Sequence, residues 1–369
     1  MRRNTVLPLT ASSRALRAGI VTDAGRLGEM HGFGSNPGAL DARIYVPDGL
    51  PGGAALVVVL HGCTQSAAAY DKGSGWSQLA DRHGFALLFP EQCRTNNANL
   101  CFNWFAPGDA RRGQGEALSI AQMVENMAAT HRIDRSRVFV TGLSAGGAMT
   151  SVMLTAYPEL FAGGAIIAGL PYASANTLPE ALEQMRGAGA LQRGELASRA
   201  KAAADYSGQA PTLSVWHGTR DTTVNPANAV AIVDQWRDVY GLGAAGSVLE
   251  TVNGHRREVW RDANGRDLIE KWDVDGMGHG TPLDTRGSEA CGKAGPHMLE
   301  AGICSTRRIA GFWGLTGAGR VQREPPRVVV ESPAVPTAVA VAPVSPMPSR
   351  ASGVGAVIED ALRAAGLMR

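Results

Sequence analysis

The run Val138-Phe139-Val140-Thr141-Gly142-Leu143-Ser144-Ala145-Gly146-Gly147-Ala148 decides how this chain folds. It predicts a short apolar strand, then Gly-Leu-Ser-Ala-Gly, then a helix that begins with small residues. This order matches the G-x-S-x-G nucleophile elbow, a sharp strand-to-helix turn that exposes a serine. We therefore expect Ser144 to be a nucleophile and the N–H of Ala145, at a helix N-terminus, to face a developing oxyanion. An incidental serine in a glycine-rich turn is the alternative interpretation.

Apolar segments alternate with helical ones on both sides of this elbow. Residues 54–60 and 85–90 are uninterrupted apolar runs, which are typical of parallel strands buried on both faces. Residues 115–131 have the apolar stripe of an amphipathic helix. Asn264-Gly265 predicts a tight hairpin turn between two later strands. The sequence thus predicts an α/β fold with a mostly parallel central sheet and helices on both faces.

Composition divides the 369 residues into four parts. Residues 1–40 are rich in Gly and Arg without clear periodicity, and we expect a flexible N-terminal arm. Residues 41–318 hold the alternating strands and helices of one catalytic domain. Residues 319–352 are rich in Pro, Ala and Val, which is typical of a linker. Residues 353–369 have helical spacing but are too few to fold as a domain.

Charge and motif content exclude several functional classes. The chain is 44% hydrophobic and 18% charged with a net charge of +2, as in soluble globular proteins. It has no basic stripe for nucleic acid and no apolar segment of about 18 residues for a membrane span. Cys-x-x-Cys and His-Glu-x-x-His spacings are absent, so we expect no metal and no other cofactor. The composition does not predict an oligomeric state.

Five cysteines bear on the cellular compartment. Their spacing favours Cys93 with Cys101 and Cys291 with Cys304, and leaves Cys63 unpaired. Fully reduced cysteines are the alternative, because spacing does not prove connectivity. Disulfides favour an oxidising compartment, extracellular or periplasmic. The N-terminal residues, however, do not resemble a clear secretory signal, so the cytoplasm remains the alternative.

A serine nucleophile needs a base and a carboxylate that orients the base. On this fold the order along the chain is serine, acid, histidine. Asp221 directly follows an apolar strand, and His279 lies in a glycine-rich loop after another strand. We therefore expect Asp221 to be the acid and His279 the base. His61 and His217 each end a strand as His-Gly, and we expect their rings to hold loop backbone.

A second oxyanion donor should come from the loop after an earlier strand. His61-Gly62-Cys63-Thr64-Gln65 follows the apolar run 54–60. The N–H of Cys63 is the predicted donor, paired with that of Ala145. A nucleophilic Cys63 is the alternative, which is weaker because no elbow surrounds this cysteine.

Several motifs together resemble the esterase family of polyhydroxybutyrate depolymerases. They span residues 42–313 and comprise Leu60-His61-Gly62-Cys63-Thr64-Gln65, Asn103-Trp104-Phe105, Gly142-Leu143-Ser144-Ala145-Gly146-Gly147, His217-Gly218 with Asp221, and Gly278-His279. The resemblance implies an α/β-hydrolase fold without a large lid. It also implies hydrolysis of short-chain poly(3-hydroxyalkanoate) esters such as poly(3-hydroxybutyrate), or of feruloyl and acetyl esters among the relatives. The expected partner is thus a polyester or a small ester.

The resemblance also implies a role for each motif residue. Ser144, Asp221 and His279 would form the triad and pass through an acyl-enzyme intermediate. Cys63 and Ala145 would form the oxyanion hole, and Trp104 would border the acyl pocket. An aromatic core position is the alternative for Trp104. A catalytically silent binding protein with the same fold is the remote alternative for the whole chain, and the intact triad order argues against it.

Overall fold

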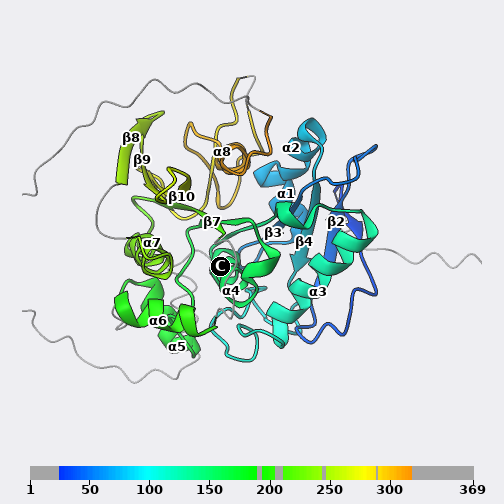
Figure 1. Cartoon of the computed structure of the whole chain (residues 1–369), viewed down its shortest axis with the longest axis horizontal. Coiled ribbons are helices and arrows are strands. Elements are labelled where there is room, and N and C mark those ends of the chain that lie inside the picture. The colour runs from blue at the N-terminus through cyan, green and yellow to red at the C-terminus, as the bar shows by residue number, and fades with distance from the viewer. Residues whose placement is uncertain (1–24, 189–192, 204–210, 243–246, 288–289, 318–369) are drawn as a thin grey trace, which may run out of the picture.

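A ten-stranded sheet forms the centre of the molecule (Figure 1). The computed structural model describes residues 25–188, 193–203, 211–242, 247–287 and 290–317. The strand order is β1-β2-β4-β3-β5-β6-β7-β10-β9-β8, and β11 and β12 form a separate two-stranded sheet. The strands are β1 (Gly28–Glu29), β2 (Asp41–Tyr45), β3 (Leu56–Leu60), β4 (Ala86–Glu91), β5 (Val138–Leu143), β6 (Gly163–Ile167), β7 (Thr212–Gly218), β8 (Ser247–Val252), β9 (His255–Arg261), β10 (Asp267–Val274), β11 (Thr281–Leu283) and β12 (Met298–Glu300).

The central six strands, from β4 to β10 in this order, run parallel, and the strands at both edges are antiparallel. The apolar run Leu56–Leu60 is buried along its whole length, as a strand covered on both faces requires. Val58 contributes to the core on one face, and Val57 and Val59 to the core on the other. The predicted α/β class with a mostly parallel sheet is confirmed.

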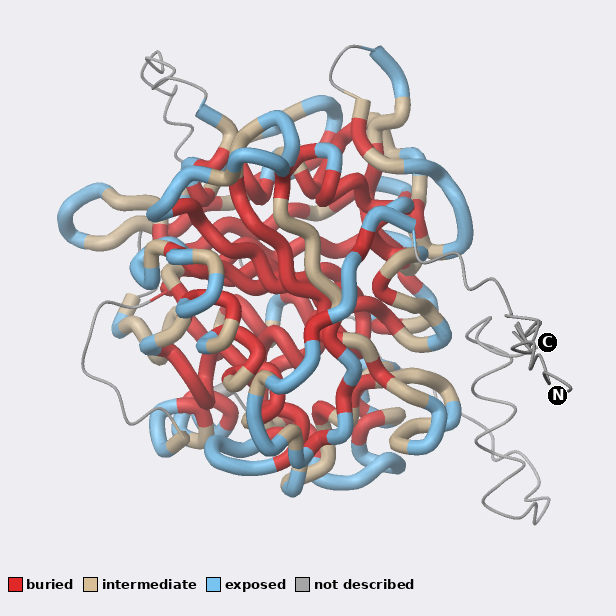
Figure 2. Tube along the Cα trace, turned by 90° about the vertical axis from the view of Figure 1, so that its right-hand side faces the viewer, coloured by how far each residue is buried: buried red, intermediate tan, exposed pale blue. Residues whose placement is uncertain are grey.

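Helices cover both faces of the sheet, and the buried residues lie in two layers on either side of it (Figures 1 and 2). Residues of α3, α4, α5, α6 and α7 belong to one core cluster, and residues of α1, α2 and α8 belong to the other. The helices are α1 (Ala67–Ser74), α2 (Trp76–His83), α3 (Gly115–Thr130), α4 (Ala145–Ala156), α5 (Leu178–Met185), α6 (Arg193–Ala203), α7 (Ala227–Val239) and α8 (Ser305–Phe312).

The N-terminal boundary of the folded part differs from the prediction. Residues 25–40, which we assigned to a flexible arm, pack onto the domain. The two residues of β1 pair with β2, and Leu27, Met30 and Leu40 are buried. The segment was missed because two paired residues leave no periodic pattern in the sequence. The predicted linker 319–352 and final helix 353–369 lie outside the described residues.

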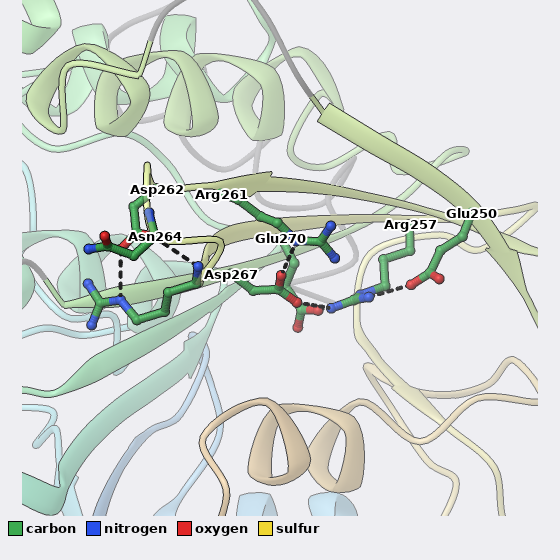
Figure 3. A network of polar contacts seen from close by, with 8 residues as sticks. Glu250, Arg257, Arg261, Asp262, Asn264, Asp267 and Glu270 are labelled. Atoms are coloured by element: carbon green, nitrogen blue, oxygen red, sulfur yellow. Dashed lines mark hydrogen bonds and ion pairs between the residues drawn. The ribbon is translucent and has the colours of Figure 1, made fainter. Parts of the chain in front are cut away.

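The far edge of the sheet is held by charged side chains on β8, β9 and β10 (Figure 3). Arg257 donates from Nε to Glu270, with an N···O distance of 2.6 Å, and also pairs with Glu250. Arg261 donates to Asp267 at 2.7 Å. Arg257 and Glu270 are both buried. The predicted Asn-Gly turn joins β9 to β10, with Gly265 at a φ of 78°.

Within the described ranges, no helix combines the length and apolarity that crossing a membrane requires.

Candidate active site

Ser144 lies at the elbow between β5 and α4. Its φ and ψ are 57° and −117°, so a residue with a side chain adopts the left-handed region. Such strained backbone persists only where the surroundings enforce it, and it clusters at functional sites. The Ser144 N–H donates to the carbonyl oxygen of Ile167 at 2.9 Å, which fixes the elbow to the end of β6. Ser144 is 8% exposed, so its hydroxyl belongs to a largely desolvated site.

The two elbow glycines are required by close backbone contacts. A Cβ atom on Gly142 would lie 2.3 Å from the carbonyl oxygen of Gly146. A Cβ atom on Gly146 would lie 2.4 Å from the carbonyl oxygen of Leu60 at the end of β3. Both separations are far shorter than van der Waals contact. The G-x-S-x-G spacing therefore reflects the packing of α4 against two neighbouring strands.

Asp221 and His279 meet at the carboxyl edge of the sheet. Asp221 follows β7 and His279 follows β10, two adjacent parallel strands. The Nδ1 atom of His279 lies 2.7 Å from Oδ2 of Asp221. Because a carboxylate only accepts, Nδ1 carries the proton and Nε2 of the neutral ring is left as a base. Ser144 follows β5 at the same edge, with β6 between it and β7.

The Asp221 carboxylate is ionised and held from several sides. Its Oδ1 atom accepts from the backbone N–H groups of Thr223 and Val224, both at 2.9 Å. Burial alone would raise its pKa, but the imidazole donors of His217 and His279 outweigh burial and hold the pKa of Asp221 well below its usual range. Asp221 therefore keeps its negative charge while it accepts from the His279 ring.

His217 supports this carboxylate from a second direction. Its Nε2 atom lies 2.8 Å from the carbonyl oxygen of Val224 and 3.3 Å from Oδ2 of Asp221. The carbonyl requires a protonated Nε2, so the ring donates to both oxygens. The expectation that His217 holds loop backbone is confirmed. Its contact with the acid was not predicted, although the three intervening residues in His217-Gly218-Thr219-Arg220-Asp221 place both side chains on one short loop.

The loop after β3 fixes the orientation of the Gly62–Cys63 peptide, and with it the direction of the Cys63 N–H. His61 donates from Nδ1 to the Gly62 carbonyl oxygen at 2.8 Å, and its Nε2 atom accepts from the backbone N–H of Gln92 at 3.1 Å. A trans peptide points its N–H away from its C=O, so this contact directs the Cys63 N–H to the other side. Within the described part of the chain, neither this N–H nor that of Ala145 donates a hydrogen bond. Both donors remain available to a ligand.

The cysteine pairing differs from the prediction at one bridge. Cys291 and Cys304 are bonded as expected, but Cys101 is bonded to Cys63 and not to Cys93. Cys93 is a free, half-buried thiol. Adjacent strands β3 and β4 bring their following loops together, so residues 38 apart in sequence approach within 4.2 Å between Cα atoms. The bridge also removes the Cys63 thiol, and so the alternative of a nucleophilic Cys63 is wrong.

Trp104 follows the bridged Cys101 and borders a pocket of about 610 Å³. The loop that carries Trp104 is held by Glu116, a fully buried carboxyl group near the start of α3. Glu116 accepts from the Asn103 N–H at 2.8 Å and from Gln92 Nε2 at 2.7 Å. Burial raises the pKa of Glu116 to about 8. Glu116 was not predicted from the sequence, in which its only signal is an acidic residue at the N-terminus of an apolar helix.

Comparison with known proteins identifies the family. Residues 40–260 match the model described as "Esterase PHB depolymerase". The chain belongs to this family. It is 47% identical over 300 residues to poly(3-hydroxyalkanoate) depolymerase C of Paucimonas lemoignei, which covers 79% of this chain and 70% of that protein. It is also 37% identical to acetylxylan esterase A of Aspergillus oryzae, over 63% of this chain and 78% of the other, and 32% identical to feruloyl esterase B of Talaromyces funiculosus, over 71% and 75%.

Among solved structures, the chain is similar to an acetyl xylan esterase from Aspergillus awamori. The TM-score is 0.64 at 29% identity, over 69% of this chain and 94% of the other. The expected α/β-hydrolase fold is confirmed. This protein is a carboxylic ester hydrolase.

Proposed function

We propose that the protein is a serine esterase that cleaves short-chain poly(3-hydroxyalkanoate) esters, such as poly(3-hydroxybutyrate). The observation that carries the proposal is the 2.7 Å contact between His279 and Asp221 at the same sheet edge as the Ser144 elbow. The 47% identity to a poly(3-hydroxyalkanoate) depolymerase supports the choice of substrate.

In the proposed mechanism, Nε2 of His279 takes the Ser144 hydroxyl proton as Oγ attacks the ester carbonyl. The N–H groups of Cys63 and Ala145 stabilise the oxyanion of the tetrahedral intermediate. His279 then returns the proton to the departing alkoxide, which leaves as an alcohol while an acyl-enzyme remains. A water molecule, deprotonated by the same ring, hydrolyses the acyl-enzyme and regenerates Ser144. Asp221 stabilises the imidazolium in both steps.

A feruloyl or acetyl esterase acting on plant polysaccharide is the second candidate. It uses the same chemistry, and the similarity to acetylxylan and feruloyl esterases favours it. Turnover of 3-hydroxybutyrate oligomers, acetylated xylan and methyl ferulate by one preparation separates the two. The depolymerase proposal expects the highest kcat/KM on the oligomers, and a preference for methyl ferulate or acetylxylan would overturn it.

The triad assignment is tested by three variants. Ser144→Ala should lose turnover of p-nitrophenyl butyrate and labelling by a fluorophosphonate while its unfolding temperature stays unchanged. His279→Ala and Asp221→Asn should each lose most activity, and the double variant should be little worse than His279→Ala, because residues that act as a unit are not additive. Multiplying losses in the double variant would show that one of the two residues is misassigned.

We further propose an extracellular or periplasmic location. The two disulfides support it, since such bonds persist in oxidising compartments. Thiol alkylation of the protein isolated from its native host should modify Cys93 alone, and modification of all five cysteines would contradict this location.

A further inference from the structure

The pocket beside Trp104 has an unusual charge. Among the described residues that line its 610 Å³, three are arginines, Arg111, Arg112 and Arg199, and none is acidic. The remaining described lining consists of aromatic side chains, a row of alanines, Pro107 and Asn176. We call it the arginine pocket. Its size suits a small organic ligand, and its walls combine apolar surface with a few cationic groups.

The three arginines differ in how many hydrogen bonds and ion pairs their guanidinium groups form. Arg112 donates to the carbonyl oxygen of Ala156 at 2.8 Å and pairs with Glu159 at 2.6 Å. Arg199 likewise donates to the carbonyl oxygen of Ala173 at 2.8 Å and pairs with a glutamate one turn earlier in α6. Their charges are therefore largely compensated, and they act as fixed walls.

Arg111 differs because it is exposed and forms no ion pair within the described residues. Arg111 and Tyr172 both line the pocket. Burial raises the pKa of the Tyr172 hydroxyl, and the positive charge of Arg111 opposes this rise. An uncompensated guanidinium beside a phenol and apolar walls is suited to a carboxylate at the end of an apolar chain.

Two residues that line the pocket lie close in sequence to segments of the proposed catalytic site. Trp104 lies three residues after Cys101, which is bonded to Cys63. Tyr172 lies five residues after Ile167, whose carbonyl oxygen accepts from the Ser144 N–H. Ala156, the last residue of α4, lines the pocket, and the rise along α4 from the elbow to this residue is about 17 Å.

We propose that the arginine pocket binds the terminal carboxylate of a hydroxyalkanoate oligoester, on the leaving-alcohol side of the scissile bond. Trp104 would then border the alcohol side of the substrate and not the acyl pocket that the family resemblance implies. This inference rests on the proposed function and adds a preference for the carboxyl end of the chain. An oligoester of this class is an apolar, methyl-branched chain with a single charge at neutral pH, and that charge is its carboxylate. Because attack at the ester carbonyl leaves the acyl part on Ser144, the carboxylate end belongs to the departing alcohol.

The test compares a free-acid hexamer of 3-hydroxybutyrate with the same hexamer capped as a primary amide. The amide is neutral and nearly isosteric, and it adds no ester bond. The wild-type protein should show a kcat/KM about fivefold higher for the acid, the size expected for one exposed ion pair. Arg111→Gln should bring the ratio close to one, and Arg111→Glu should invert it. Arg82→Gln, an exposed arginine on α2, is the matched control and should keep the wild-type ratio.

Equal wild-type values for acid and amide, or an unchanged ratio in Arg111→Glu, would overturn the proposal. Binding of the acid hexamer to Ser144→Ala, followed by tryptophan fluorescence, gives a reading without turnover. If the wild-type protein hydrolyses no hexamer, the proposed function fails, and this binding measurement with and without Arg111→Glu still decides about the pocket.

Discussion

Replacing Gly146 by alanine tests whether the elbow depends on contact between backbones. The new Cβ atom would lie 2.4 Å from the Leu60 carbonyl oxygen and 2.5 Å from that of His61. Both oxygens belong to the backbone at the end of β3, so no side-chain rotation relieves the overlap. The helix α4 must move away from β3 by nearly 1 Å to restore ordinary contact.

The expected loss follows from this geometry. Overpacking of a close-packed interior costs about 1–3 kcal/mol, and we expect the upper end, about 3 kcal/mol, because two backbone oxygens are involved. For a domain of this size the loss corresponds to a fall in unfolding temperature of about 5 °C. Activity should fall more steeply, since a shift of α4 separates Ser144 and the Ala145 N–H from the donor on Cys63.

Thermal unfolding by circular dichroism and turnover of p-nitrophenyl butyrate measure the two effects. Gly194→Ala is the matched control, because Gly194 is exposed near the start of α6 and a Cβ atom there meets nothing within 4 Å. This control should be neutral or slightly stabilising. If Gly146→Ala unfolds at the wild-type temperature with turnover within twofold of wild type, the steric argument is wrong.

Three other predictions concern groups outside the triad. Arg257→Met should lower the free energy of unfolding in urea by about 3–5 kcal/mol, because the buried Glu270 loses its partner. Glu116→Gln should remove a pH dependence of stability. Burial raises the pKa of Glu116 from 4.5 to about 8, so between these values the folded state holds a proton that the unfolded chain has released, and wild-type stability falls as pH rises, by about 1.4 kcal/mol per unit. Replacing Cys63 and Cys101 together by alanine should cost about 4 kcal/mol.

Each of these predictions has its own contradicting result. Restored stability in an Arg257→Met, Glu270→Leu double variant would agree with the ion-pair argument, whereas a loss under 1 kcal/mol in Arg257→Met would refute it. Equal pH dependence in wild type and Glu116→Gln would show that the buried carboxyl group does not titrate in this range. Cys93→Ala should leave the unfolding temperature unchanged, and a large fall would mean that Cys93 is bonded.

Local sequence was sufficient for the features that depend on neighbouring residues. The Gly142–Gly146 turn was predictable because the motif that forms it is contiguous, although the demand on Gly146 comes from the Leu60 carbonyl oxygen of β3. The apolar runs at residues 54–60 and 85–90 predicted β3 and β4, because burial on both faces excludes polar side chains from most of their positions. Asp221 and His279 were predictable because residues that follow parallel strands share one edge of the sheet, and the 2.7 Å contact between them confirms that reasoning. The catalytic roles of Ser144, Asp221 and His279 stay predictions.

Other features depend on which segments the sheet brings together. Cys101 bonds to Cys63 across 38 residues, although Cys93 is only eight residues away, because β3 and β4 are neighbours in the sheet. Residues 25–40 join the domain through an edge strand of two residues. The arginine pocket combines loop 104–112 with residues of α6. The entropy of closing a loop changes slowly with its length, so nearness in sequence discriminates weakly between partners, and the packing of the strands decides which distant residues meet.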